Sequence, residues 1–315
     1  MTDSQKPARR KVFLSFADPR LNRSLNRIKL EAENLGVFDL TLTKSSDDLA
    51  TEFLNEFKDE LKLGSRGFGY WVWKPQIILQ TLDEMRDGDL LAYADVGFHI
   101  NPKGKTRLLE YFDLVQKSKS GVLGFQGRRP ELPMKDDGRP LPTWPEREYS
   151  KGDLLDFFNV RGVPEILESP QFHAGLLFIR KCSSSVSFVN EWLNVFRADF
   201  KLADDTPSRS ANEPGFREHR HDQSIYSILS KMRGTDSISS NEFWYPKSWI
   251  SQGDWAALED FPFHARRDMD FGPIENFKRK TRRTLMMFMP SNFWHSVKLM
   301  VGRIRLRFEP NRTEH

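Results

Sequence analysis

The sequence contains a single cysteine, Cys182, among its 315 residues. One thiol cannot form an internal disulfide, and chains with so little cysteine are typical of reducing compartments. Long hydrophobic runs are also missing. The longest candidate, residues 284–301, is interrupted by Pro290, His295 and Lys298, and no stretch has the ~18–20 apolar residues of a membrane helix. The basic N-terminus is not followed by the apolar run of a secretory signal. We therefore expect a cytoplasmic protein, soluble or peripheral at the inner face of the plasma membrane.

Acidic residues are absent from a long segment near the C-terminus. Residues 276–308 contain nine Lys and Arg residues and no Asp or Glu, whereas the whole chain has a formal net charge of only +4. The rest of the chain therefore carries a net negative charge. In the tail, Phe293, Trp294, Val297 and Met300 fall on one helical face. This pattern is typical of a helix on an anionic membrane surface, and a terminal helix packed on the domain is the alternative.

The remaining composition, with 38% hydrophobic and 12% aromatic residues, is typical of a globular chain with a substantial core. Hydrophobic patterning predicts strands over 11–17, 37–43, 89–95, 122–125 and 172–179, and helices over 21–35, 49–63, 75–86, 106–117, 185–196 and 222–229. Such alternation predicts an α/β fold with an open sheet. We expect a disordered basic N-terminus (1–10), one domain (11–270) and a basic amphipathic helical extension (271–315).

Residues 67–75 (GFGYWVWKP) join two glycines and several aromatic side chains to the start of a helix. Unpaired backbone N–H groups and the helix dipole attract phosphate at such a position, and the ammonium of Lys74 adds positive charge. The rings of Trp71 and Trp73 are suited to stacking on a base or a sugar. The alternative is a tight turn whose aromatic side chains pack in the core.

Three further segments carry polar side chains that could bind a ligand. Asp95 ends a buried strand, where open α/β sheets bind ligands, although it could simply cap a turn. HRHDQS (219–224) contains Asp222, which could also be the N-cap of the following helix. FHARR (263–267) combines a histidine with two arginines close to the basic tail.

Together these segments resemble a known pattern. The block GYWVWKPQIILQTLDEMRDGDLLAYADVG (69–97) resembles the DXD region of bacterial GT-A glycosyltransferases of the capsule and lipopolysaccharide type, which are related to glycogenin. QFHAGLLFIRK (171–181) and HRHDQSI (219–225) resemble two later segments of the same family, and the resemblance extends in order from Lys11 to about Arg267. It implies the GT-A fold, a Rossmann-like mixed sheet flanked by helices.

The resemblance also implies roles for individual residues. Donor binding would involve Ser15, Phe16, Ala17, Tyr70, Trp73, Lys74, Asp95, His173, Ala174, Gly175 and Arg266. Asp222 and Gln223 would contact the transferred sugar and act in catalysis. Asp95 and His264 would hold a metal ion.

Metal dependence is left open by one departure from the family pattern. Gly97 stands where the DXD motif has its second Asp, and its lack of a carboxylate removes one hard oxygen ligand. Either Asp95, His264 and the phosphates hold Mn²⁺ or Mg²⁺, or Lys74 and the arginines at 266 and 267 neutralise the diphosphate alone. We expect the metal.

The sequence thus predicts a hexosyltransferase-type glycosyltransferase. It would move a sugar from a nucleotide-diphosphate donor, expected to be a UDP-sugar, to a saccharide or lipid-linked acceptor in surface polysaccharide synthesis. The loop 127–150, with Trp144, would position the acceptor. No inverting base stands out, so we expect retention of configuration. The alternatives are an inactive relative that only binds nucleotide sugars, and a nucleic-acid-binding protein that uses the basic tail. Because no nucleic-acid motif appears, no nucleic-acid partner is expected.

Overall fold

The computed structural model describes residues 9–127, 144–244, 255–267 and 270. The chain divides into two compact units, Met1–Met269 and Asp270–His315, and every helix and strand given below belongs to the first. Most of the predicted N-terminal segment 1–10, the centre of the loop 127–150 and the extension 271–315 lie outside the described residues. The membrane contact expected of the tail therefore stays a prediction.

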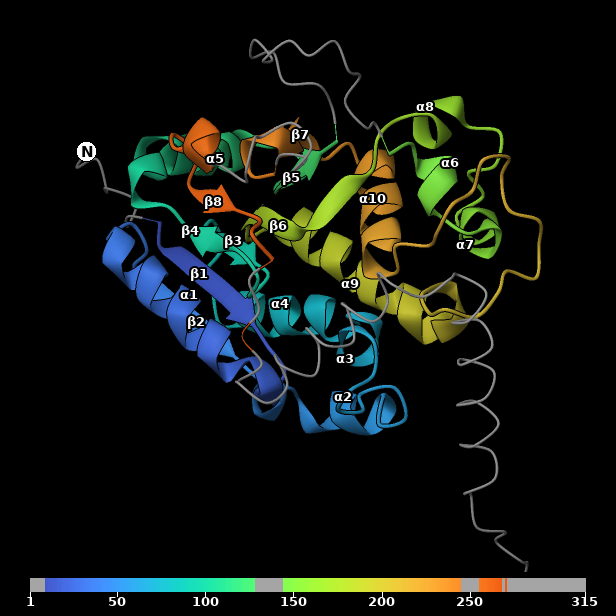
Figure 1. Ribbon diagram of the computed structural model, residues 1–315, viewed down its shortest axis with the longest axis horizontal. Coiled ribbons are helices and arrows are strands. Elements are labelled where there is room, and N and C mark those ends of the chain that lie inside the picture. Colours follow the sequence, from blue (N-terminus) through green and yellow to red (C-terminus); the bar gives the residue numbers. More distant parts are fainter. Residues whose placement is uncertain (1–8, 128–143, 245–254, 268–269, 271–315) are drawn as a thin grey trace, which may run out of the picture. The chain divides into compact units, whose positions relative to one another are not determined.

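A six-stranded sheet with the strand order β2-β1-β3-β6-β5-β7 forms the centre of the first unit (Figure 1). Its strands are β1 (Lys11–Phe16), β2 (Leu40–Lys44), β3 (Leu90–Ala94), β5 (Val122–Gln126), β6 (Phe172–Arg180) and β7 (Asp236–Ser239). β6 pairs antiparallel with β3 and β5, and the other strands of this sheet run parallel to one another. A second, two-stranded sheet pairs β4 (His99–Ile100) with β8 (Phe263–His264). The predicted fold class, an α/β mixed sheet flanked by helices, is confirmed.

Helices cover both faces of the sheet. They are α1 (Asn22–Leu35), α2 (Thr51–Glu56), α3 (Gly67–Tyr70), α4 (Trp73–Asp83), α5 (Lys105–Lys117), α6 (Glu146–Tyr149), α7 (Gly152–Phe157), α8 (Pro164–Leu167), α9 (Ser183–Ala198) and α10 (Asp222–Met232). α1 ends at Gly36, whose φ of 61° is left-handed, a conformation that glycine adopts without strain. Among the helices of the described ranges, none combines the length and apolar character needed to cross a bilayer.

The two faces of the sheet contact different helices because side chains alternate along a strand. On one face, Val12, Leu14 and Tyr93 belong to a core cluster that includes the buried side chains of α4, α9 and α10. On the other face, the ring of Phe178 in β6 lies 5.3 Å from that of Phe112 in α5. In Figure 1, α4 and α9 accordingly lie on one side of the sheet and α5 on the other.

The direction of β6 brings its first residues to the carboxyl edge of the sheet. Because β6 is antiparallel to β3, Ala94 at the end of β3 pairs with Leu176. The backbone N–H of Asp95 then donates to the carbonyl oxygen of Gly175, at 2.8 Å. Residues 173–175 therefore lie beside Asp95, at the edge where open α/β sheets bind ligands.

Some elements differ from the sequence-based expectation. The helix predicted over 49–63 is limited to α2, because the chain turns at Phe57, whose carbonyl accepts from the N–H groups of Glu60 and Leu61 at 3.1 and 2.9 Å. The helix predicted from Pro75 begins at Trp73. The short helices α6, α7 and α8 lie in a stretch where no helical pattern was recognised.

Candidate functional site

Three residues from distant parts of the chain meet at the carboxyl edge of the sheet. The ammonium nitrogen of Lys74, in the first turn of α4, lies 3.2 Å from Oδ1 of Asp95 and 2.9 Å from Oδ2 of Asp222. It also donates to the carbonyl oxygen of Ala174, at 3.2 Å. One lysine thus links the end of β3, the start of α10 and the start of β6.

Burial and charge together set the protonation of this cluster. Lys74 is 2% exposed and Asp222 4%, whereas the side chain of Asp95 is 34% exposed. Burial lowers the pKa of Lys74, but the carboxylates of Asp222 and Asp95 outweigh it, and the net shift is upward. Burial raises the pKa of Asp222 to about 6, with a further rise from Asp95 and an opposing effect of Lys74.

This pKa predicts a pH-dependent stability. The carboxyl of Asp222 titrates near 3.8 in the unfolded chain and near 6 in the folded one, so the folded state binds the proton more tightly. The resulting contribution, about 3 kcal/mol, is complete below the unfolded pKa and is lost as the pH rises through 6. Asp222→Asn lacks this titration. We compare the unfolding free energy of this variant with that of the native chain at each pH. The difference, variant minus native, should increase by about 3 kcal/mol as the pH rises from below 4 to above 6.

Urea unfolding at a series of pH values measures this difference directly. Lys74 and Asp95, the charged groups that face Asp222, are present in both chains. Parallel pH profiles of the two chains would show that Asp222 does not have the raised pKa.

The two carboxylate oxygens of Asp95 have different neighbours. Oδ1 accepts from the hydroxyl of Tyr93 at 2.7 Å and faces Lys74. Oδ2 lies on the side of Gly175, where a Cβ would be 3.1 Å from this oxygen and 3.2 Å from Cε2 of Phe98. Glycine at position 175 therefore keeps space beside the carboxylate.

The turn after Asp95 is fixed by a residue that the sequence analysis did not identify. Arg27 of α1 donates from Nη1 to the carbonyl of Phe98 and from Nη2 to that of Val96, both at 2.8 Å. Glu31, one helical turn further along α1, accepts from Arg27 at 3.0 Å. No local motif signals these contacts, because they join residues about seventy positions apart in the sequence.

The segment before Lys74 has an unusual backbone. Residues 67–71 have consecutive positive φ values of 57°, 51°, 83°, 50° and 63°, which form a left-handed turn. A Cβ at Gly67 would lie 2.5 Å from the ring of Trp71, so only glycine fits there. The ring of Trp71 in turn stacks on His221, with centroids 5.8 Å apart. His221 itself has φ 56° and ψ −124°.

This geometry limits which N–H groups could take part in the phosphate site expected at residues 67–75. The backbone N–H groups of residues 68–72 all donate to acceptors in the chain, for example Gly69 to Ser65 Oγ at 2.9 Å and Tyr70 to the Arg66 carbonyl at 2.8 Å. The cradle of unpaired N–H groups expected for phosphate is therefore not formed by these described residues. The ammonium of Lys74 likewise faces three acceptors of the protein, and a direct contact with diphosphate would require the release of one of them.

Several residues expected to bind the donor lie in the core. The side chains of Ser15, Phe16 and Ala17 are buried, and the hydroxyl of Ser15 donates to the Ala94 carbonyl at 2.8 Å. The ring of Trp73 stacks on Phe16 with centroids 4.0 Å apart. For Trp73, the structure thus shows the packing alternative. Contact of these residues with a donor stays a prediction.

Tyr70 and His173 have different surroundings. The hydroxyl of Tyr70 donates to Oδ2 of Asp205 at 3.0 Å. Nε2 of His173 is buried and has no hydrogen-bond partner among the residues that the structure describes. Burial lowers the pKa of His173 to about 3, with further lowering from the guanidinium groups of Arg220 and Arg267. His173 is therefore neutral, and positive charge lies nearby. Its ring contacts Trp144, with centroids 5.7 Å apart.

The expected metal site has Asp95 and His264 as its protein ligands and the donor phosphates as further ligands. Within the described ranges, no group of three or more His, Cys, Asp or Glu side chains is placed to hold a metal ion. Nε2 of His264 lies 2.8 Å from the carbonyl of Leu258 and must donate to it. The remaining acceptor, Nδ1, lies 3.4 Å from Nη2 of Arg266. A metal ion at Asp95 and His264 remains a prediction.

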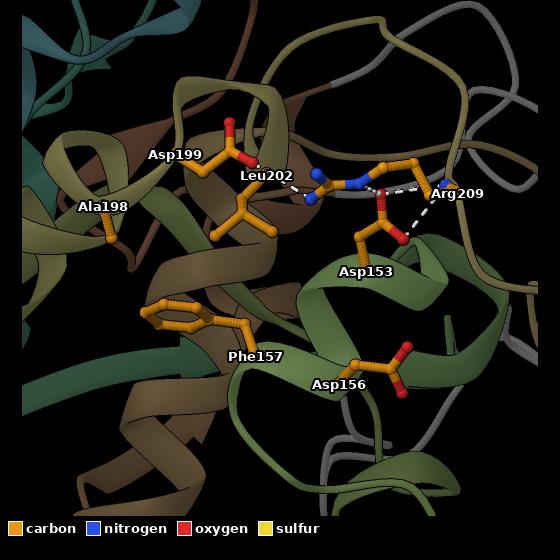
Figure 2. Close-up of a pocket in the computed structure, with 7 residues that line it drawn as sticks. All are labelled: Asp153, Asp156, Phe157, Ala198, Asp199, Leu202 and Arg209. Carbon is orange, nitrogen blue, oxygen red and sulfur yellow. Dashed lines mark hydrogen bonds and ion pairs between the residues drawn. The ribbon is translucent and has the colours of Figure 1, made fainter.

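A separate cavity of about 340 Å³ lies where α7 meets the end of α9 (Figure 2). Figure 2 shows Arg209 between the carboxylates of Asp199 and Asp153, which line the cavity. Nη2 of Arg209 is 3.0 Å from Oδ2 of Asp199. The backbone N–H of Arg209 donates to Asp153 at 3.0 Å. Burial raises the pKa of Asp153, but its hydrogen bonds from Arg209 and Ser210 outweigh this and lower it to about 2. Because these acids already have partners within the chain, we do not include this cavity in the candidate site.

Comparison with solved structures finds glycosyltransferases among the matches. A glycosyltransferase involved in the glycosylation of the major capsid of PBCV-1 is 11% identical, with a TM-score of 0.40 over 81% of this chain and 91% of that one. Mouse xyloside xylosyltransferase 1 is 9% identical, with a TM-score of 0.41 over 81% and 97%. The galactosyltransferase LgtC, solved with donor and acceptor sugar analogues, is 10% identical, with a TM-score of 0.38 over 83% and 87%.

Proteins with other activities match as well, among them a mannose-6-phosphate isomerase of Helicobacter pylori. No protein-family model and no curated protein matches this chain. The TM-scores given above are below 0.5, so the function has to be argued from the side chains at the carboxyl edge of the sheet.

Proposed function

We propose that this chain is a glycosyltransferase that moves a sugar from a nucleotide-diphosphate donor to a saccharide or lipid-linked acceptor. The observation that carries the proposal is the bridge of Lys74 between Asp95 and Asp222 at the carboxyl edge of a mixed α/β sheet. A buried lysine that holds two acidic groups side by side fixes them relative to each other. A buried carboxyl group at such an edge whose pKa is raised, as that of Asp222 is, favours a functional site over a purely structural one.

The bridge gives each of its carboxylates a definite position for the reaction. Glycosyl transfer breaks the bond between the anomeric carbon and the diphosphate, forms a bond to an acceptor oxygen, and releases the acceptor proton. Asp222 and its neighbour Gln223 lie in the first turn of α10 and would face the donor sugar. Negative and polar oxygens there stabilise the positive charge that develops at the anomeric carbon. We keep retention of configuration as a prediction.

The departing diphosphate requires positive charge. Arg266 and Arg267 follow β8 and are exposed, and within the described part of the chain neither forms an ion pair with a carboxylate. The carbonyl of Phe243 accepts from the N–H of Ala265 at 2.9 Å, and the ring of Phe243 contacts His173. The two arginines therefore come from a segment attached close to the candidate site. We propose that they, more than Lys74, face the diphosphate.

Nucleotide binding provides the first test. If the site takes a UDP-sugar, saturation at 100 times the Kd stabilises the folded chain by about 2.7 kcal/mol. The melting midpoint should then rise by several degrees. We expect UDP and UDP-sugars to raise it more than GDP- or CMP-sugars, measured with Mn²⁺, with Mg²⁺ and with a chelator.

The same screen separates the alternatives. Binding of a nucleotide sugar without transfer or hydrolysis would indicate an inactive relative. If no nucleotide diphosphate shifts the midpoint at millimolar concentration, the proposed site is wrong. Equal shifts with the metal and with the chelator would contradict the expected metal dependence.

A further inference from the structure

Gln223 is held by its amide nitrogen. Its Nε2 donates to Oε1 of Gln171, at 3.0 Å. Its other end, Oε1, forms no hydrogen bond with another residue of the described ranges. Because Gln223 directly follows Asp222 in α10 and is only half-buried, its unpaired carbonyl oxygen is the end left for a ligand.

Gln171 is held in turn by a buried carboxylate. Its Nε2 donates to Oε1 of Glu146 at 2.8 Å, and the side chain of Glu146 is fully buried. The other carboxylate oxygen, Oε2, accepts from the ammonium of Lys231 at 2.7 Å and from the hydroxyl of Ser227. A carboxylate paired with a lysine accepts hydrogen bonds and does not donate. Glu146 therefore decides which end of the Gln171 amide faces it.

The orientation of the Gln171 amide determines the orientation of the Gln223 amide. Since Nε2 of Gln171 must face Glu146, its Oε1 must face Gln223. That oxygen can only accept, so Gln223 turns its own Nε2 toward it. We propose that Glu146 and Gln171 are positioning residues that make Gln223 present its carbonyl oxygen, and not its amide nitrogen, to the hydroxyl groups of the donor sugar. The inference rests on the proposed function.

This polarity matters for the rate. Asp95 and Asp222 are acceptors as well, so the site would consist of oxygens suited to sugar hydroxyls acting as donors and to a carbon that becomes positive. Hydrogen bonds to sugar hydroxyls strengthen in the transition state of glycosyl transfer. An amide turned the wrong way should therefore reduce kcat more than it reduces donor binding.

Two variants test this polarity. Gln171→Leu removes the acceptor that holds Gln223, and we expect kcat to fall about tenfold with donor Kd within about threefold. The double variant Glu146→Gln with Gln171→Glu exchanges the amide and the carboxylate. Residue 171 again accepts from Gln223, residue 146 donates to residue 171, and Lys231 keeps an acceptor. We expect its kcat to return to within about threefold of the native value.

A matched control removes a neighbouring hydrogen bond that does not involve Gln223. Nε2 of Gln126 donates to the carbonyl of Pro170 at 2.9 Å, next to Gln171. Gln126→Leu should leave kcat nearly unchanged. Hydrogen exchange of the Gln223 side-chain amide, followed by NMR, gives a readout without turnover: the amide should be protected in the native chain and in the double variant, and not in Gln171→Leu.

The possible outcomes are distinct. Unchanged kcat and unchanged amide protection in Gln171→Leu would overturn the inference. An equal loss of kcat in Gln171→Leu and in the double variant would show a merely structural role and would also overturn it. If the native chain transfers no sugar, the proposed function fails, while the amide exchange still shows whether Gln171 orients Gln223.

Discussion

Replacement of Lys74 by methionine is expected to destabilise the fold by about 3–5 kcal/mol at neutral pH. The substitution removes the only ammonium group within ion-pair distance of Asp222 in the described structure. It leaves a carboxylate buried without a charge partner, which is the costly way to break a buried ion pair. Urea unfolding measures the loss. It should be smaller at acidic pH, because protonated Asp222 no longer carries the uncompensated charge.

The double variant Lys74→Met with Asp222→Asn should recover part of that stability, because the two residues are coupled. Lys62→Met serves as the matched control, since Lys62 pairs with Asp59 at 3.4 Å with both side chains more than half exposed. That variant should show little or no change. A Lys74→Met chain as stable as the control would mean that the bridge does not hold the site together.

Asp95→Asn is expected to reduce transfer on the order of 100-fold or more while the chain stays folded. The substitution removes the negative charge of a partly exposed side chain and preserves its shape. It is comparable to the loss of one preorganised electrostatic partner in an active site. Steady-state transfer or donor hydrolysis measures the effect, and the melting midpoint reports on folding.

Asp113→Asn is the matched control for this change, because Asp113 is exposed on α5 and lies outside the candidate site. It should transfer sugar at the native rate. Near-normal turnover by a folded Asp95→Asn chain would show that the carboxylate is not needed for transfer. Asp95 would then be only a turn residue, whose backbone N–H donates to the carbonyl oxygen of Gly175.

Part of the site can be predicted from the sequence because its signals are local. Asp95 follows a buried strand and Asp222 begins a patterned helix, so each is recognisable by itself. Their common contact with Lys74 depends on the antiparallel direction of β6 and on the placement of α10, which no local pattern specifies. The contacts of Arg27 with the turn after β3, and of Glu146 with Gln171, are long-range for the same reason.

The segment 67–75 shows a different limit. Its composition is compatible with both a phosphate-binding helix start and a packed turn, since glycines and aromatic residues suit either. The outcome depends on backbone dihedral angles, and residues such as Phe68 and Tyr70 carry no signal for a left-handed conformation. Only the full set of contacts decides where the ring of Trp73 and the ammonium of Lys74 lie.

The left-handed turn has a consequence for how ligand binding relates to folding. For L-residues such a conformation costs about 1–2 kcal/mol per residue, so Phe68, Tyr70 and Trp71 keep it only while the surroundings hold it. His221, more than a hundred residues later in the sequence, supplies the ring on which Trp71 stacks. A fragment that ended before α10 would contain Lys74 but not this support. If the chain binds a nucleotide sugar as proposed, that binding would report completed folding. A partly synthesised or clipped chain should then fail to bind before it fails to form the first strands.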